Sequence, residues 1–158
     1  SYGFTSEING ILFLHHIANE LNLITSEIKC MQMHSLSTQK SKSILVVDDN
    51  GINRLLPGLI LRPFGWEVHE ADGGLAALEI LKTIHIACVL LDISMPEVSG
   101  LEVLEDLRRD SKFEALKVVA YTAYAQPQDV ARLLSLGFDA VLIKPLTSVK
   151  LLDILKTS

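Results

Sequence analysis

The chain has 158 residues, of which 49% are hydrophobic and 21% are charged, and its formal net charge is −5. This length and apolar content suit one compact domain with a sizeable core, together with one appendage. Because the chain is mildly acidic and contains no basic tract, it is a poor electrostatic match for nucleic acid, and we expect no nucleic-acid partner.

Residues 1–33 lack proline and show the periodicity of an amphipathic helix. Their apolar side chains recur at alternating intervals of three and four residues, at Leu14, Ile17, Leu21, Ile24, Ile28 and Met31. This spacing is typical of a coiled-coil seam, which a single helix cannot bury alone. We therefore expect a helix that forms a homodimer through this seam. Packing of the helix against the rest of its own chain is the alternative.

Residues 34–42 are polar and are predicted to link this helix to a second region, residues 43–158, in which short apolar runs alternate with helical patterns. The predicted strands lie at 44–47, 67–70, 86–91, 118–121 and 140–143. The predicted helices lie at 51–64, 74–82, 101–109, 128–136 and 146–156. Pro57 lies inside the first of these helices and is expected to kink it.

This alternation predicts a doubly wound α/β fold, in which helices cover both faces of a five-stranded parallel sheet. The two cysteines, Cys30 and Cys88, are far apart, which favours free thiols in a reducing compartment over a disulfide scaffold. The apolar stretch at 11–14 is too short to span a bilayer, and we expect no signal peptide because the first residues lack its basic region and cleavage site. We therefore expect a cytoplasmic protein without a membrane partner.

Reactive side chains stand at the carboxyl ends of the predicted strands. Asp48 and Asp49 follow the first strand, Asp92 the third, Thr122 the fourth and Lys144 the fifth. A parallel sheet brings these ends to one edge, where doubly wound folds have their sites. Carboxylates held close together repel one another unless a cation is bound, and their hard oxygens suit Mg²⁺. With the lysine charge and the threonine hydroxyl, the set predicts carboxylate-based phosphoryl transfer centred on Asp92.

Each of these residues has a simpler interpretation when it is considered alone. An aspartate or threonine after a strand is ordinarily the cap of the next helix, and Lys144 by itself is a solvated surface lysine. The convergence of all five at strand ends favours a site.

The motifs also resemble, in order and approximate spacing, the receiver domain of two-component response regulators over about residues 43–157. The residues that carry the resemblance are Asp48-Asp49, Leu91-Asp92-Ile93-Ser94-Met95-Pro96 with Gly100, Thr122-Ala123 and Lys144-Pro145. The resemblance implies a flavodoxin-like sheet with strand order 2-1-3-4-5, here with an extra N-terminal helix.

The resemblance further implies the chemistry. Asp92 would accept a phosphoryl group from a histidine kinase or a phosphotransfer protein, forming an aspartyl phosphate. Lys144 would pair with the phosphoryl oxygens, and Thr122 would move to hydrogen-bond them. The expected Mg²⁺ ligands are Asp49, Asp92 and the backbone carbonyl of Ser94, together with Asp48, which would act partly through water. The phosphorylated domain would be a switch that signals through protein contacts, with no enzymatic activity beyond its own phosphorylation and dephosphorylation.

Two positions near the predicted site bear on how such a switch works. Val141 stands where many receivers carry a tyrosine or phenylalanine that swings inward as the threonine moves, and a valine cannot swing in that way. Tyr124, two residues after Thr122, is a candidate for partly covering the site and affecting hydrolysis of the aspartyl phosphate, with an ordinary surface tyrosine as the alternative.

The segment from His15 to Ile24 resembles the histidine-bearing helix of sensor kinases. Aligned in this way, His15 falls on the phosphorylated histidine. His16, Ala18 and Glu20 depart from that helix's acidic, basic and proline positions. An accessory phosphohistidine at His15 is one interpretation, and a solvent-facing helix residue is the other.

Three other functions compete with the phosphoacceptor. The first is a phosphorylation-independent receiver-like scaffold for dimerisation or docking, which Val141 favours. The second is a flavodoxin-like module that binds a small ligand, which the absence of a glycine-rich loop after the first strand disfavours. The third is a metal-dependent phosphatase with an aspartyl nucleophile, which would carry a second aspartate where Ser94 stands.

The apolar seam predicts that the protein self-associates, because water is excluded from the stripe when two copies pair. Size-exclusion chromatography with light scattering at micromolar concentration is expected to give the mass of a dimer. A monomer mass under these conditions would contradict the seam as a dimer interface.

Overall fold

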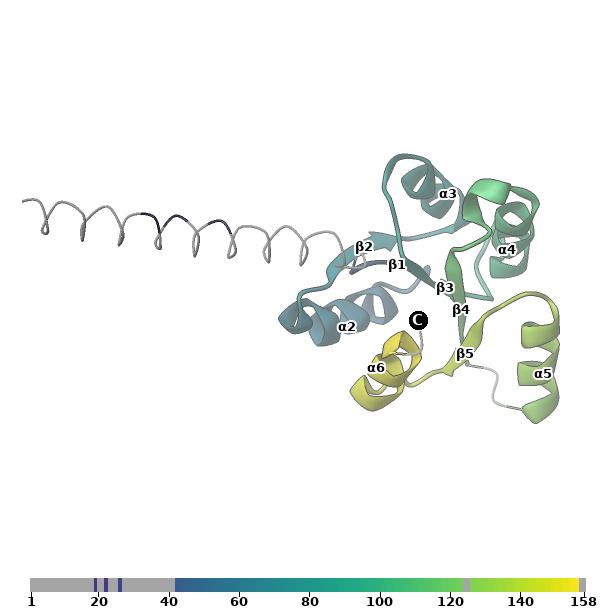
Figure 1. Ribbon diagram of the computed structural model, residues 1–158. Helices are drawn as coiled ribbons and strands as arrows, with labels where there is room; N and C mark the ends of the chain where they lie inside the picture. The colour runs from purple at the N-terminus through teal and green to yellow at the C-terminus, as the bar shows by residue number, and fades with distance from the viewer. Residues whose placement is uncertain (1–18, 20–21, 23–25, 27–41, 124–125, 157–158) are drawn as a thin grey trace, which may run out of the picture. The chain divides into compact units, whose positions relative to one another are not determined.

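The computed structural model describes residues 19, 22, 26, 42–123 and 126–156 (Figure 1). The chain divides into two compact units, Ser1–Lys40 and Ser41–Ser158. In the first unit Asn19, Asn22 and Ser26 are helical and exposed. The predicted seam from Leu14 to Met31 lies outside the described residues, so its pairing stays a prediction.

The second unit is built on one parallel five-stranded sheet with the strand order β2-β1-β3-β4-β5, which confirms the predicted topology. The strands are β1 (Ser43–Val47), β2 (Glu67–Ala71), β3 (Cys88–Asp92), β4 (Lys117–Thr122) and β5 (Ala140–Ile143). The chain goes from β1 to β2 on one side and then crosses to β3 on the other. The strand order therefore reverses at β1, and the carboxyl ends of β1 and β3 flank the crevice in which such sheets bind ligands.

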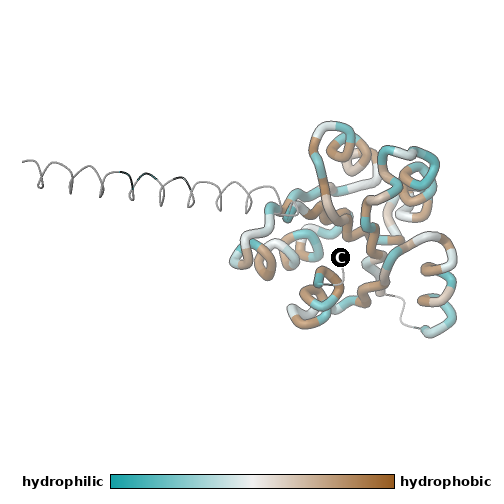
Figure 2. Tube along the Cα trace, viewed as in Figure 1, coloured by the Kyte–Doolittle hydropathy of each residue, from teal (hydrophilic) through white to brown (hydrophobic). Residues whose placement is uncertain are grey.

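Successive side chains of the strands belong alternately to two apolar clusters, one on each face of the sheet. In β1, Leu45 and Val47 join one cluster, while Ile44 and Val46 join the other. All four are fully buried. Figure 2 shows the hydrophobic residues concentrated along the strands at the centre of this unit. Because both faces are covered, the central strands β1, β3 and β4 are continuous apolar runs rather than alternating ones.

The helices are α2 (Gly51–Leu61), α3 (Gly74–Thr83), α4 (Gly100–Arg109), α5 (Pro127–Ser135) and α6 (Ser148–Lys156), with 3₁₀ turns η1 (Arg62–Phe64) and η2 (Ser111–Phe113). Helices α3, α4 and α5 contribute buried side chains to the cluster that contains Leu45. Helices α2 and α6 contribute to the cluster on the opposite face (Figure 1). No helix in the described part of the chain is long and apolar enough to cross a membrane.

Two helix boundaries differ from the sequence prediction by more than one residue. Helix α2 continues through the buried Pro57 and ends at Leu61, where η1 with Pro63 replaces the predicted last turn. Helix α6 starts at Ser148 rather than at residue 146, although Leu146 is buried in the core. Apolar character therefore predicted which side chains are buried more reliably than where the helical hydrogen bonds start and stop.

The exposure of Cys88, in β3, shows how well the sheet is shielded from solvent. Its side chain is 2% exposed, and burial raises the pKa of its thiol from 9.0 to about 12. Near pH 8 the unfolded chain forms some thiolate, whereas the folded chain keeps this thiol protonated and shielded. In a Cys30→Ser variant, which leaves Cys88 as the sole cysteine, a thiol reagent is expected to label nothing in buffer and one thiol in urea. Rapid labelling in buffer would contradict this burial.

Candidate functional site

The carboxyl ends of four strands bring the candidate residues to one edge of the sheet. Asp48 directly follows β1, Asp92 ends β3, Thr122 ends β4 and Lys144 directly follows β5. Asp48, Asp92 and Thr122 are buried, with relative exposures of 0%, 5% and 1%. The backbone N–H of Lys144 donates to the Thr122 carbonyl at 2.8 Å, so the ends of β4 and β5 are joined at this edge.

Asp48, Asp49 and Asp92 form a tight acidic cluster. One carboxylate oxygen from each lies within 4.8 Å of the others, with Asp48 and Asp92 buried and Asp49 exposed. Oxygen ligands of this kind, with one side open to water, fit Mg²⁺, which keeps several waters and takes few carboxylates. The Ser94 backbone N–H donates to Asp92 Oδ1 at 3.3 Å, which holds this residue beside the cluster. The role of the Ser94 backbone carbonyl as a fourth Mg²⁺ ligand stays a prediction.

Lys144 supplies the positive charge beside this cluster. Its Nζ lies 2.7 Å from Asp48 Oδ2 and 3.4 Å from Asp92 Oδ1, and its side chain is 18% exposed. The interpretation of Lys144 as a solvated surface lysine is therefore wrong. The ammonium bridges the two buried carboxylates because a single positive charge reduces the repulsion between them.

The acidity of Asp92 reflects this crowding. Burial raises the pKa of the Asp92 carboxyl above its ordinary value, and the neighbouring Asp48 carboxylate raises it further. Lys144 and the Ser94 amide lower this pKa and only partly offset the increase. A cation bound among these carboxylates would favour the ionised form, so the cluster is chemically matched to a metal.

The carboxylate of Asp48 is already engaged on both oxygens. Oδ1 accepts from the Asn50 backbone N–H at 2.9 Å and from Asn53 Nδ2 at 3.4 Å, while Oδ2 pairs with Lys144. The Asp48 carbonyl accepts from Arg54 Nη1 at 2.8 Å. Asn53 and Arg54 belong to α2, so this helix fixes the loop that carries the acidic pair.

The capping interpretation of the strand-end residues is wrong. Helix α2 is capped by the Asn50 side chain, α4 by the Ser99 side chain, and the N-cap position of α5 is Gln126. Asp48, Asp92 and Thr122 are therefore not helix caps. The carboxylates of Asp48 and Asp92 instead belong to the acidic cluster at the sheet edge.

Comparison with known proteins agrees with the geometry. Residues 44–156 match the response regulator receiver domain family. The chain is 33% identical over 117 residues to the polar-differentiation response regulator DivK of Brucella ovis, covering 74% of this chain and 95% of that protein. This chain belongs to the response regulator receiver family.

Solved receiver structures share its fold. The Thermotoga maritima response regulator TrrA, in complex with Mg²⁺-BeF, is 33% identical with a TM-score of 0.64, covering 73% of this chain and 96% of that one. The Vibrio cholerae chemotaxis response regulator CheY4 is 25% identical with a TM-score of 0.68, over 73% and 96% of the two chains. The receiver domain thus occupies the second unit of this protein.

Tyr121 is a neighbour of the site that the sequence did not reveal. It pairs with Asp92 across β3 and β4, is 1% exposed, and its ring centroid lies 4.7 Å from Lys144 Nζ. Burial, together with the Asp48 and Asp92 charges, raises the pKa of its hydroxyl to about 12. The neutral ring packs beside the ammonium, which is a favourable cation–π contact.

Of the three remaining predicted residues, only Val141 lies in the described part of the chain. Val141 lies in β5 opposite Ala120 and packs against the apolar cluster on the α3 side. Tyr124 and His15 lie outside the described residues, so gating by Tyr124 and phosphorylation of His15 stay predictions.

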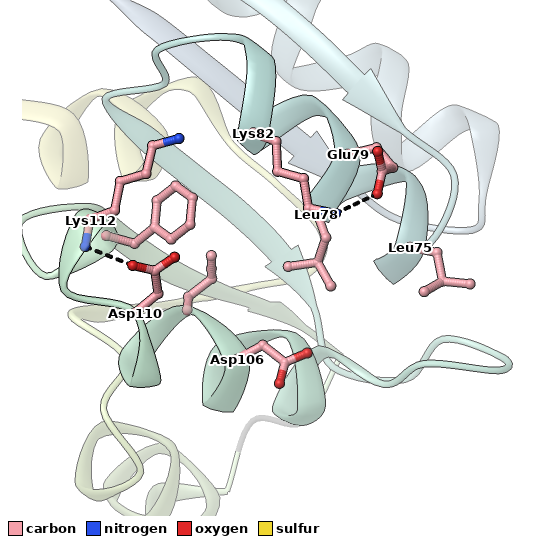
Figure 3. A pocket seen from close by; sticks show the side chains of 9 residues that line it. Leu75, Leu78, Glu79, Lys82, Asp106, Asp110 and Lys112 are labelled. Carbon is pink, nitrogen blue, oxygen red and sulfur yellow. Dashed lines mark hydrogen bonds and ion pairs between the residues drawn. The ribbon is translucent and has the colours of Figure 1, made fainter.

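A separate hollow of about 340 Å³ lies between α3 and α4 (Figure 3). Leu75 and Leu78 line one side and Asp106 the other. At its rim Lys82 pairs with Glu79 at 2.7 Å. None of the strand-end residues lines this hollow, so it is not part of the candidate site.

Gly100 is sterically required next to Asp92. A Cβ at this position would lie 2.1 Å from the Asp92 carbonyl oxygen, and the Gly100 N–H donates to the Ile93 carbonyl at 3.1 Å. Helix α4 therefore starts directly against the strand end that carries Asp92, and only glycine permits this approach.

Gly100→Ala is expected to lower the free energy of unfolding by about 2 kcal/mol, because backbone atoms beside Asp92 must move to admit the methyl group. Urea denaturation followed by the fluorescence of Trp66, the single tryptophan, measures the change. Gly73→Ala is the control, since a Cβ there meets nothing within 4 Å, and its cost should stay below about 1 kcal/mol. Equal effects of the two substitutions would refute the steric argument.

Proposed function

We propose that this receiver domain is a phosphoacceptor switch in which Asp92 accepts a phosphoryl group from the phosphohistidine of a histidine kinase or phosphotransfer protein. The observation that carries the proposal is the meeting of Asp92 with Asp48, Asp49 and Lys144 at one edge of the sheet. The likeness to a receiver solved with Mg²⁺-BeF supports it.

In the transfer, a carboxylate oxygen of Asp92 attacks the phosphorus of the donor. A P–O bond forms and the P–N bond to the donor imidazole breaks, and the leaving nitrogen keeps the electron pair and takes a proton. Asp48, Asp49, Asp92 and the Ser94 carbonyl are the proposed Mg²⁺ ligands. When bound, Mg²⁺ supplies positive charge that stabilises the negative oxygens of the transferring group.

Lys144 and Thr122 act on the phosphorylated form. The Lys144 ammonium, now 3.4 Å from Asp92 Oδ1, is placed to pair with phosphoryl oxygens attached to that carboxylate. The Thr122 hydroxyl, at the end of the neighbouring strand, donates a hydrogen bond to the same group. Because the Thr122 carbonyl bonds the Lys144 amide at 2.8 Å, a movement of Thr122 is transmitted to the β5 end.

The switch acts through protein partners rather than on a substrate. We infer that the phosphorylated receiver is recognised by a downstream protein, and that its chemistry is limited to its own phosphorylation and dephosphorylation. The net charge of −5 disfavours nucleic acid as the target.

A second candidate is a phosphorylation-independent docking scaffold. Val141 favours it, because the valine packs in the apolar cluster and has no ring to swing toward Thr122. The buried Asp92, which is paired with Lys144, counts against the scaffold. Burying charged groups costs free energy, and a scaffold that is never phosphorylated gains nothing from keeping them there.

Intact mass spectrometry after incubation with acetyl phosphate, with and without Mg²⁺, distinguishes these candidates. The wild type is expected to gain one phosphoryl group only when Mg²⁺ is present, and Asp92→Asn is expected to gain none, because the amide is a poor nucleophile. Asp106→Asn is the matched control: this aspartate is exposed on α4 and should leave phosphorylation unchanged.

Two outcomes would refute the phosphoacceptor. Failure of the wild type to gain mass under any condition would favour the scaffold. Equal modification of the wild type and Asp92→Asn would place the phosphoryl group on another residue.

A further inference from the structure

Arg54 connects the acidic loop to the edge strand β2. Its Nη1 donates to the Asp48 carbonyl at 2.8 Å, and its Nε lies 3.8 Å from Glu70 Oε2. The side chain is only 22% exposed. A guanidinium presents several donors in one rigid plane, so one side chain can contact a carbonyl and a carboxylate in different directions.

The carbonyl that Arg54 contacts belongs to the peptide between Asp48 and Asp49. A peptide unit is planar, so fixing its oxygen also fixes the amide nitrogen and Cα of the next residue. The flanking bonds are Asp48 N–H to the Ala71 carbonyl at 3.2 Å and Asn50 N–H to Asp48 Oδ1 at 2.9 Å. Asp49 itself is exposed. The bond from Arg54 and these flanking bonds together hold the backbone from which this exposed carboxylate leaves the loop.

We propose that Arg54 is a positioning residue that orients the Asp48–Asp49 peptide for cation binding, with Glu70 of β2 holding the guanidinium in place. This inference rests on the proposed function, because it assumes that the acidic cluster holds Mg²⁺. It assigns the charged pair of α2 and β2 a role in the site, although neither residue belongs to the cluster.

The charge of Arg54 is expected to weaken cation binding, whereas its hydrogen bond to the loop is expected to strengthen it. A cation near the cluster is repelled by the guanidinium, so removing that charge alone would raise metal affinity. Arg62 provides a control for the effect of charge alone, because its Nη2 pairs with the same Glu70 at 3.5 Å. Among the described residues, Arg62 makes no hydrogen bond to the loop at 48–50.

The test compares Arg54→Gln with Arg62→Gln, which remove the same charge near the same partner. Mn²⁺ binding, followed by water-proton relaxation and competed with Mg²⁺, reports on the cluster without any phosphorylation. Arg54→Gln is expected to weaken Mn²⁺ binding about tenfold, the usual effect of losing a group that orients a metal ligand. Arg62→Gln should stay within about twofold of the wild type. Arg54→Lys should fall between, since an ammonium offers one nitrogen where the guanidinium contacts the carbonyl and the carboxylate through two, Nη1 and Nε.

Amide hydrogen exchange in metal-free protein gives a second readout. In Arg54→Gln the amides of Asp48 and Asn50 are expected to exchange about tenfold faster, as for the loss of one supporting hydrogen bond. In Arg62→Gln they should not change. Urea denaturation of both variants controls for a general loss of stability.

Each outcome bears on a different claim. Unchanged or tighter Mn²⁺ binding by Arg54→Gln, or equal effects of the two variants, would overturn the positioning role. Failure of the wild type to bind Mn²⁺ or Mg²⁺ would instead overturn the metal step of the proposed function. In that case unchanged exchange at Asp48 and Asn50 would overturn the role of Arg54 in ordering the loop as well.

Discussion

Repulsion between carboxylates at the ends of β1 and β3 is the constraint on which the rest of the site depends. Asp48 and Asp92 are buried at 0% and 5% exposure, and Asp49 has an oxygen within 4.8 Å of both. Left to themselves, such groups would separate or take up protons. They stay together because β1 and β3 pair directly from Ile44 to Val47 within a closed apolar core. The free energy gained by burying the apolar core therefore offsets the repulsion within the acidic cluster.

The neighbouring groups can each be understood as a response to that repulsion. Lys144 reaches both buried carboxylates from the end of β5, and backbone and side-chain N–H groups of Asn50 and Asn53 bond Asp48. Each donor stabilises the ionised form of a carboxylate. The pKa of Asp92 nevertheless remains raised by burial and by Asp48. The protein's own donors thus only partly offset the effects of burial and of the neighbouring Asp48 charge on Asp92.

The sequence predicted the central strands well because β1, β3 and β4 are buried on both faces and form apolar runs that end at polar residues. β5 was predicted at 140–143, as observed, and Asp92 was correctly placed at the end of β3. Residues 86 and 87 were wrongly included in the third strand, because Ile86 is buried although it lies before the ladder. Burial and strand pairing leave the same apolar signal, and sequence alone does not separate them.

The supporting residues of the site were harder to predict. Arg54 reads in sequence as a charged residue on the exposed face of a helix, and Tyr121 reads as core. Their roles depend on the strand register, which sets Glu70 against Val46 and Tyr121 against Asp92. The capping interpretation of the aspartates failed for a local reason, since Asn50 and Ser99 cap the helices that follow.

Lys144 contacts both buried aspartates, so the events proposed at one would affect the other. In this structure its Nζ is closer to Asp48, at 2.7 Å, than to Asp92, at 3.4 Å. Phosphorylation, as proposed, would convert Asp92 from a single carboxylate charge to a group with more negative oxygens, and would draw the ammonium toward it. Asp48 Oδ2, which now pairs with that ammonium, would then be free to face a cation or its water. Cation binding at Asp48 and phosphoryl binding at Asp92 would therefore favour each other through one shared lysine, and by linkage the coupling has the same magnitude in both directions.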